Sequence, residues 1–150
     1  LSALEDAKKN SVKIINDSSK LNNEYYDKII SNHTLQHCED PLRELQNLNR
    51  SLKENGLIII VTACSSKDLS YKSNDINYQL YSWSPMNLGN ILDAAGFEAI
   101  EIKKYTFRWL PKYQFFYKIF GAKIFNFFCY LYGFFNTKIS DIIAIAKKRN

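Results

Sequence analysis

Glycine and cysteine are both scarce in this sequence. No two of its five glycines stand close enough to form a G-x-G turn, so residues 1–150 contain no glycine-rich phosphate loop. The three cysteines, Cys38, Cys64 and Cys129, are widely spaced and form no C-x-x-C pair. This spacing argues against both a disulfide framework and a zinc ribbon. We expect reduced thiols and a cytoplasmic protein.

The excess of positive charge is also small: the net charge is only +5, and the lysines are spread along the chain. No basic stripe of the kind that binds nucleic acid is evident, so we expect no nucleic-acid partner. The 150 residues fit one domain and, with 46% apolar residues, can bury a hydrophobic core.

The clearest pattern lies between Tyr26 and Val61. The apolar segment 26–31 predicts a strand that ends in small polar residues, and Asp40 followed by Pro41 predicts the start of an amphipathic helix. We expect Asn55 and Gly56 to close that helix and to open a second buried strand over 57–63. Strand, helix and strand in this order predict a parallel βαβ unit.

Further elements follow the same logic. Ser84 and Pro85 predict a helix capped by Gly96, and apolar segments predict strands over 12–15, 97–103 and 142–146. The polar residues after the strand 26–31 would lie at the carboxyl edge of the sheet, where open α/β proteins bind ligands.

Four short motifs follow one another along the chain: DKIISNH (27–33), LQH (35–37), DP (40–41) and LKENG (52–56). Together they resemble the middle of a class I S-adenosylmethionine-dependent methyltransferase. Gln36 stands where that family usually has Glu, and Asn55 stands where it usually has the first Gly.

The resemblance implies an α/β fold: a partial Rossmann-like methyltransferase sheet, mostly parallel, whose antiparallel last strand is inserted between the two before it. It implies that residues 1–150 are the C-terminal part of a single methyltransferase domain, without the first two strands and the Gly-rich loop. We therefore expect this chain alone to bind S-adenosylmethionine weakly or not at all, and to be inactive. The intact parent is expected to methylate a small molecule through oxygen or carbon.

By the same resemblance, five polar residues bind the cofactor. Asp17 and Ser18 would meet the adenine as an acceptor beside a donor, and the loop after the strand 26–31 would lie beside the methionyl part. The alternative for Asp17 is a local turn that ends the preceding strand. The cofactor-binding candidates are Asp17, Ser18, Ser31, Asn32 and His33.

His37 is the catalytic candidate, because an imidazole exchanges protons near neutral pH and can serve as a general base. A structural role in its loop is the alternative. Tyr78, Tyr81 and Trp83 are candidates for acceptor binding by resemblance, although Trp83 could instead anchor the following helix in the core. We expect no metal site, because His33 and His37 have no third ligand at a useful spacing.

The aromatic segment 112–135 predicts a helical insertion before the last strand. We expect the face formed by Phe116, Phe120, Phe127 and Leu131 to pack on the domain. Lys118 and Lys123 argue against a membrane span. A second hypothesis is a non-catalytic α/β module that docks a membrane surface or a partner through this helix.

Overall fold

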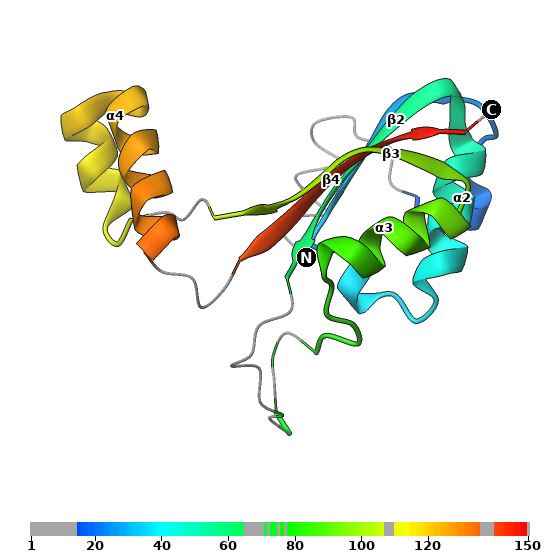
Figure 1. Ribbon diagram of the computed structural model, residues 1–150, viewed down its shortest axis with the longest axis horizontal. Coiled ribbons are helices and arrows are strands. Elements are labelled where there is room, and N and C mark those ends of the chain that lie inside the picture. Colours follow the sequence, from blue (N-terminus) through cyan, green and yellow to red (C-terminus); the bar gives the residue numbers. More distant parts are fainter. Residues whose placement is uncertain are drawn as a thin grey trace.

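The computed structural model of this chain describes residues 15–64, 71, 73–74, 76, 78–106, 110–135 and 140–149. A four-stranded sheet carries two helices on one face, and a third helix extends beyond one end of the sheet (Figure 1). The elements in chain order are η1 (Ser18–Lys20), β1 (Tyr26–Asn32), η2 (Leu35–His37), α2 (Pro41–Ser51), β2 (Leu52–Ala63), α3 (Pro85–Ala94), β3 (Phe97–Tyr105), α4 (Tyr113–Phe135) and β4 (Asp141–Lys148).

The strand order is β1-β2-β4-β3. β1 pairs with β2 in parallel, as a βαβ unit requires, and β4 runs antiparallel to both of its neighbours. This order confirms that the last strand is antiparallel and inserted between the two before it. The predicted strand 12–15 lies outside the described residues except for Ile15, which belongs to no strand.

Helix α2 begins as the sequence predicts. The Asp40 side chain accepts a hydrogen bond of 3.0 Å from the Arg43 backbone N–H, and Pro41 occupies the first turn. The predicted end of α2 is wrong, because the helix stops at Ser51 rather than at Asn55 and Gly56.

Sheet pairing explains the earlier end of α2. Leu52 is fully buried and pairs with Tyr26, so β2 starts five residues before the expected position. Asn55, with φ 58°, takes the left-handed conformation inside the strand. A Cβ at Gly56 would lie 2.9 Å from the Lys53 carbonyl oxygen, so the glycine is needed here for space rather than as a helix cap.

Helix α3 has a complete N-terminal cap. The Ser84 hydroxyl accepts from the Asn87 backbone N–H, and the Asn87 side chain accepts from the Ser84 backbone N–H. Gly96, with φ 87°, ends the helix as predicted. Leu88 and Leu92 are fully buried in the core.

The two faces of the sheet differ. Both α2 and α3 lie on one side (Figure 1), where Ile58, Ile60 and Ala144 are buried. On the other face Ile59, Val61 and similar residues are half-buried, and Ile30 is 71% exposed. The core of the described part of the chain therefore lies between the sheet and these two helices.

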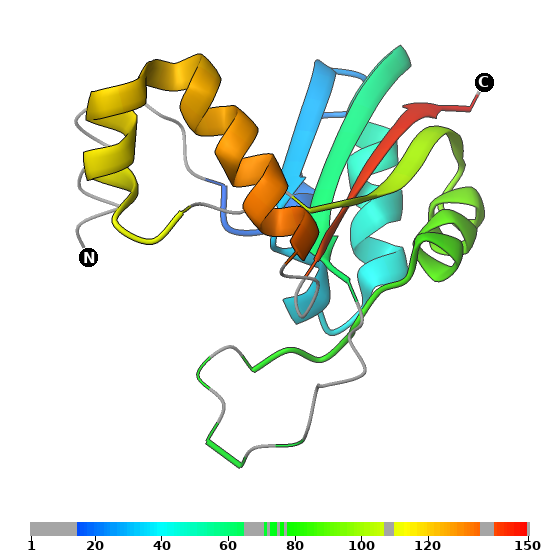
Figure 2. The same cartoon turned by 60° about the vertical axis from the view of Figure 1, so that its left-hand side comes forward.

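Helix α4 confirms the predicted helical insertion but not its predicted packing. Gly121 has non-helical angles (φ 67°, ψ 173°) and bends the helix into two arms, which Figure 2 shows. The predicted packing face is largely exposed, with Phe127 at 63%. Phe125 and Cys129 are buried instead, because the arms pack on each other: the ring centroids of Tyr117 and Phe125 are 5.5 Å apart.

A substitution in the β2 core tests this packing. Ile60 lies on β2 and is fully buried on the face that the helices cover. Ile60→Ala should therefore lower the free energy of unfolding by about 2–5 kcal/mol. Met86, exposed on α3, provides the control: Met86→Ala should change stability by less than about 0.5 kcal/mol. Urea denaturation of the two variants measures both values, and equal small effects would contradict the described core.

Candidate functional site

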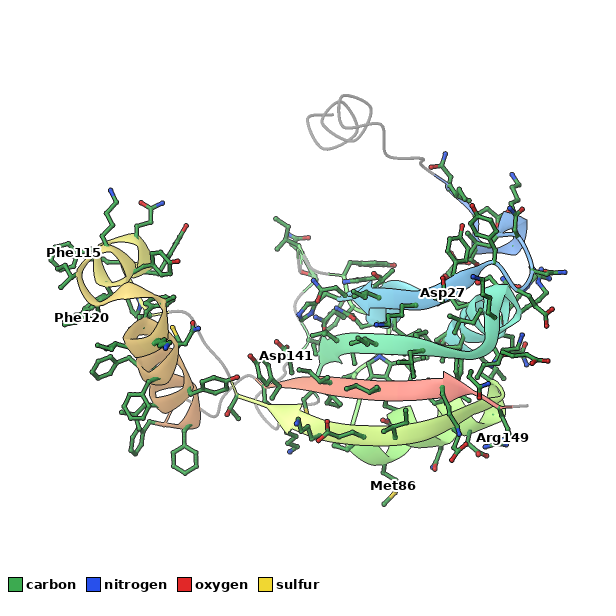
Figure 3. The ribbon with its side chains drawn as sticks, turned by 90° about the horizontal axis from the view of Figure 1, so that it is seen from above. Asp27, Met86, Phe115, Phe120, Asp141 and Arg149 are labelled. Carbon is green, nitrogen blue, oxygen red and sulfur yellow. The ribbon has the colours of Figure 1, made fainter. Side chains whose placement is uncertain are left out.

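The candidate site lies at the carboxyl edge of β1 and β2. The parallel ladder continues past β1, where the His33 backbone N–H donates to the Val61 carbonyl oxygen at 2.7 Å. Asn32 and His33 thus emerge from the end of β1 beside the last residues of β2. Asp141 begins β4 at the same end, opposite Ala63 (Figure 3).

Gln36 joins three segments at this edge, and we call its hydrogen bonds the Gln36 junction. The side chain is 1% exposed, and its Oε1 accepts a hydrogen bond of 2.8 Å from the Thr62 hydroxyl on β2. Its backbone carbonyl accepts from the backbone N–H groups of Leu80 and Tyr81 at 2.9 and 3.1 Å. A buried amide so bonded holds the loop after β1, the end of β2 and segment 78–81 in one arrangement.

His33 is held between two polar groups. Its backbone is left-handed, with φ 51°, which turns the chain sharply after β1. Its Nδ1 lies 3.5 Å from Gln36 Nε2, and its Nε2 lies 3.6 Å from the Asp141 carboxylate. With Nδ1 accepting from the amide, the ring hydrogen sits on Nε2 and faces Asp141.

His37 has a different environment. It is exposed, and its Nδ1 lies 3.3 Å from the Tyr78 carbonyl oxygen. A hydrogen donated from Nδ1 to that carbonyl leaves the lone pair on Nε2, which is the form a general base requires.

Neighbouring Cys38 is less suited to chemistry. Burial and the nearby Glu44 carboxylate raise the pKa of the Cys38 thiol, so it is protonated and weakly nucleophilic. Within the described residues no group of three metal-ligating side chains comes together.

Asp17 and Ser18 line a cavity of about 450 Å³ that also reaches Cys38 and the first turn of α2. The Asp17 carboxylate caps η1 by accepting from the Ser19 backbone N–H at 2.9 Å. This is the local turn that the sequence left as an alternative. The Ser18 hydroxyl donates to Glu44 and accepts from Asn47.

The Ser19 hydrogen bonds and the nearby Lys20 and Arg43 charges lower the pKa of Asp17. Asp17 therefore stays ionised, and only one of its oxygens is used by the Ser19 backbone. A second cavity, of about 620 Å³ around Tyr25 and Lys53, lies at the amino end of β1, away from the edge where parallel sheets bind ligands.

The three aromatic candidates separate into two groups. Tyr78 is exposed and meets His37 through its backbone, and the Tyr81 hydroxyl donates to the Glu39 carbonyl at 3.1 Å. Trp83 is 4% exposed, belongs to the core and stacks on Tyr81 with ring centroids 5.8 Å apart. Its Nε1 is buried without an acceptor among the described residues.

Tyr105 and Tyr130 close the site toward α4. Their hydroxyl oxygens are 3.4 Å apart, which links the end of β3 to the helix. Burial, the hydrogen bond with Tyr130 and the Asp141 charge together raise the pKa of Tyr105 to about 12. Tyr105 is therefore a protonated phenol at physiological pH and not a general base.

Sequence reasoning missed Thr62 and Asp141 and noted Gln36 only as an unusual residue. Each left a weak signal: a polar residue at the end of a buried strand, an acid directly before the last strand, and an amide between Leu35 and His37. Ser31, by contrast, lies in β1 opposite Ile60, half-buried on the helix-covered face.

Comparison with known proteins agrees with this geometry. A family described as "Methyltransferase domain" matches residues 3–102. The chain therefore belongs to the methyltransferase-domain family. No curated protein sequence matches the chain.

Solved structures show the same fold at low identity. The chain resembles a phosphoethanolamine N-methyltransferase 2 of Haemonchus contortus bound to S-adenosylhomocysteine (TM-score 0.65, 16% identity, covering 99% of this chain and 40% of that one). It resembles the 1,6-didemethyltoxoflavin-N1-methyltransferase of Burkholderia thailandensis (TM-score 0.62, 15% identity, 99% and 56% covered). It also resembles the [4+2]-cyclase SpnF (TM-score 0.62, 16% identity, 98% and 61% covered).

The Gln36 junction can be tested by removing its donor. Thr62→Val leaves a buried amide oxygen without a donor, so the free energy of unfolding should fall by about 1–3 kcal/mol. In a double-mutant cycle with Gln36→Leu, the pair should show a coupling energy of at least about 0.5 kcal/mol.

Thr34→Val is the matched control for the same measurement. The Thr34 hydroxyl is exposed and donates only to the Asn32 carbonyl oxygen, so its loss should cost less than about 1 kcal/mol. If urea denaturation gives Thr62→Val no larger an effect than Thr34→Val, the junction does not hold this edge together.

Proposed function

We propose that the protein carrying this chain transfers a methyl group from S-adenosylmethionine to a small-molecule acceptor. One observation carries the proposal: within a methyltransferase-family fold, the Asn32–His33 turn and the His37 loop follow the carboxyl end of β1, and the Asp17 cavity reaches Cys38 in that loop.

The residues present fit part of the cofactor. The cavity beside Asp17 has apolar walls from Ile15, Leu21 and Leu48, which suit a flat adenine ring. The ionised Asp17 has a carboxylate oxygen beyond the one that caps η1. This oxygen lies 4.0 Å from Lys20 Nζ and can also accept a hydrogen bond from the adenine amino group. Asn32 and His33 would meet the methionyl part.

The chain's own residues explain orientation and proton removal. S-adenosylmethionine, when bound, supplies an activated methyl group on a sulfonium. The catalytic requirement on the protein is then in-line positioning of the acceptor, and an oxygen acceptor must also lose its proton. His37 Nε2 can take that proton, while Asp141 and Gln36 keep the His33 ring in place.

The share of its relatives' length that this chain covers supports a cofactor site that includes residues outside 1–150. The chain spans 61% and 40% of the lengths of two of the solved structures that it resembles, and it contains no G-x-G turn. We propose that it is the C-terminal part of a single methyltransferase domain, with 112–135 as a helical insertion.

A small-molecule acceptor and a cytoplasmic location complete the proposal. Two of the solved structures are named for methylation of small molecules, phosphoethanolamine and 1,6-didemethyltoxoflavin. Cys38, Cys64 and Cys129 are all free thiols, which is typical of a reducing compartment. The cyclase SpnF has the same fold, so the chemistry has to be tested directly.

Asp17→Asn tests the cofactor assignment. The amide keeps an acceptor oxygen for the Ser19 N–H but replaces the second oxygen with a donor. We expect S-adenosylhomocysteine to bind the parent protein about 10- to 100-fold more weakly, the loss of one hydrogen bond to a charged group. Isothermal titration measures the dissociation constant.

Asp27→Asn is the control, because Asp27 is also an exposed carboxylate with a lowered pKa, yet it pairs with Lys53 on β2. It should leave cofactor affinity unchanged. Equal affinities for both variants would remove Asp17 from the site. A parent protein that forms no S-adenosylhomocysteine and binds none would instead favour a non-catalytic docking module.

A further inference from the structure

Helix α4 exposes far more apolar surface than a soluble domain usually does. It extends beyond the end of the sheet that carries Asp141, and Phe115 and Phe120 point away from the strands (Figure 3). The exposed apolar side chains of α4 form what we call the aromatic surface: Tyr113, Phe115, Tyr117, Ile119, Phe120, Ile124, Phe127, Phe128, Tyr130, Leu131, Phe134 and Phe135.

Helix α4 is exposed even though it has internal packing of its own. The two arms of α4 already pack on each other, with Phe120 and Phe128 ring centroids 6.2 Å apart and Phe125 and Cys129 buried. Tyr130 also contacts Tyr105 at the end of β3. The aromatic surface is what is left outside this small core.

The segment of sequence that contains α4 carries charge of one sign. Between Glu101 and Asp141 the sequence has no acidic residue and seven basic ones. Lys118 and Lys123 are exposed on α4 itself, among the aromatic side chains. A surface of this kind complements an anionic one and repels another copy of itself.

Mixed aromatic and lysine side chains are typical of helices that lie in the headgroup region of a bilayer. No helix within the described residues is long and apolar enough to cross a membrane. We propose that α4 docks on a membrane surface that contains anionic phospholipids. Its aromatic side chains enter the headgroup region, and Lys118 and Lys123 meet the phosphates.

Docking would also orient the candidate site. Tyr130 on α4 contacts Tyr105, which pairs with Asp141 across the sheet, and Asp141 lies 3.6 Å from His33. A membrane bound by α4 therefore lies on the side of the carboxyl edge. The interaction itself requires no catalysis and is independent of the proposed methyl transfer.

Vesicle flotation of the whole chain tests the proposal. The protein should float with vesicles of phosphatidylcholine mixed with phosphatidylserine, and much less with phosphatidylcholine alone. Phe127→Ser combined with Phe134→Ser should weaken the partition at least about tenfold, because both side chains are exposed on the aromatic surface. Lys118→Ala and Lys123→Ala should each cost about fivefold.

Matched controls sit on the body of the domain. Met86→Ser removes an exposed apolar side chain from α3, and Lys28→Ala removes an exposed lysine from β1; neither should change flotation. The proposal fails if the unchanged chain floats with neither vesicle, or if Met86→Ser acts like the phenylalanine pair. It also fails if the phenylalanine pair disperses a dimer in sedimentation while no vesicle binds.

Discussion

The hydrogen bonds of one buried amide hold the candidate site of this protein together. Gln36 receives the Thr62 hydroxyl at 2.8 Å, contacts the His33 ring and accepts two backbone N–H groups from segment 78–81. Gln36 is 1% exposed and Thr62 is fully buried, so neither side chain can turn to bulk water, and losing their bond leaves a desolvated partner. The position of both histidines depends on this junction, because His33 touches its side chain and His37 follows it directly and bonds to Tyr78.

The sheet and α4 differ in how they bury their apolar side chains. In the sheet, alternate residues of β2 and β4 are buried under α2 and α3, which gives a conventional core. In α4, Gly121 bends the chain so that a few aromatic rings pack on each other and the rest are exposed. An aromatic, acid-free element attached beside Asp141 is the surface that we propose binds anionic lipids, an interaction that the family fold alone does not imply.

Much of the fold could be predicted from sequence because its signals are local. The start of α2 at Asp40 and Pro41, the start of α3 at Ser84 and its end at Gly96 all lie where the sequence predicts them. The end of α2 does not. That end depends on the pairing of Leu52 with Tyr26, a contact between distant residues that no local pattern reveals. The same limit applies to the site: Thr62 and Asp141 matter through partners far along the chain, and the packing of α4 was missed because the Gly121 bend reassigns its faces.

The central claim is that the carboxyl edge around the Gln36 junction is where the cofactor binds. Nuclear magnetic resonance of the isotope-labelled protein that carries this chain, titrated with S-adenosylhomocysteine, tests it most directly. The account predicts that the largest amide shifts fall on Asn32, His33 and Cys64 at that edge, and on the Asp17 cavity that reaches Cys38. Shifts confined to the amino end of β1 around Tyr25 and Lys53, or to α4, would contradict it.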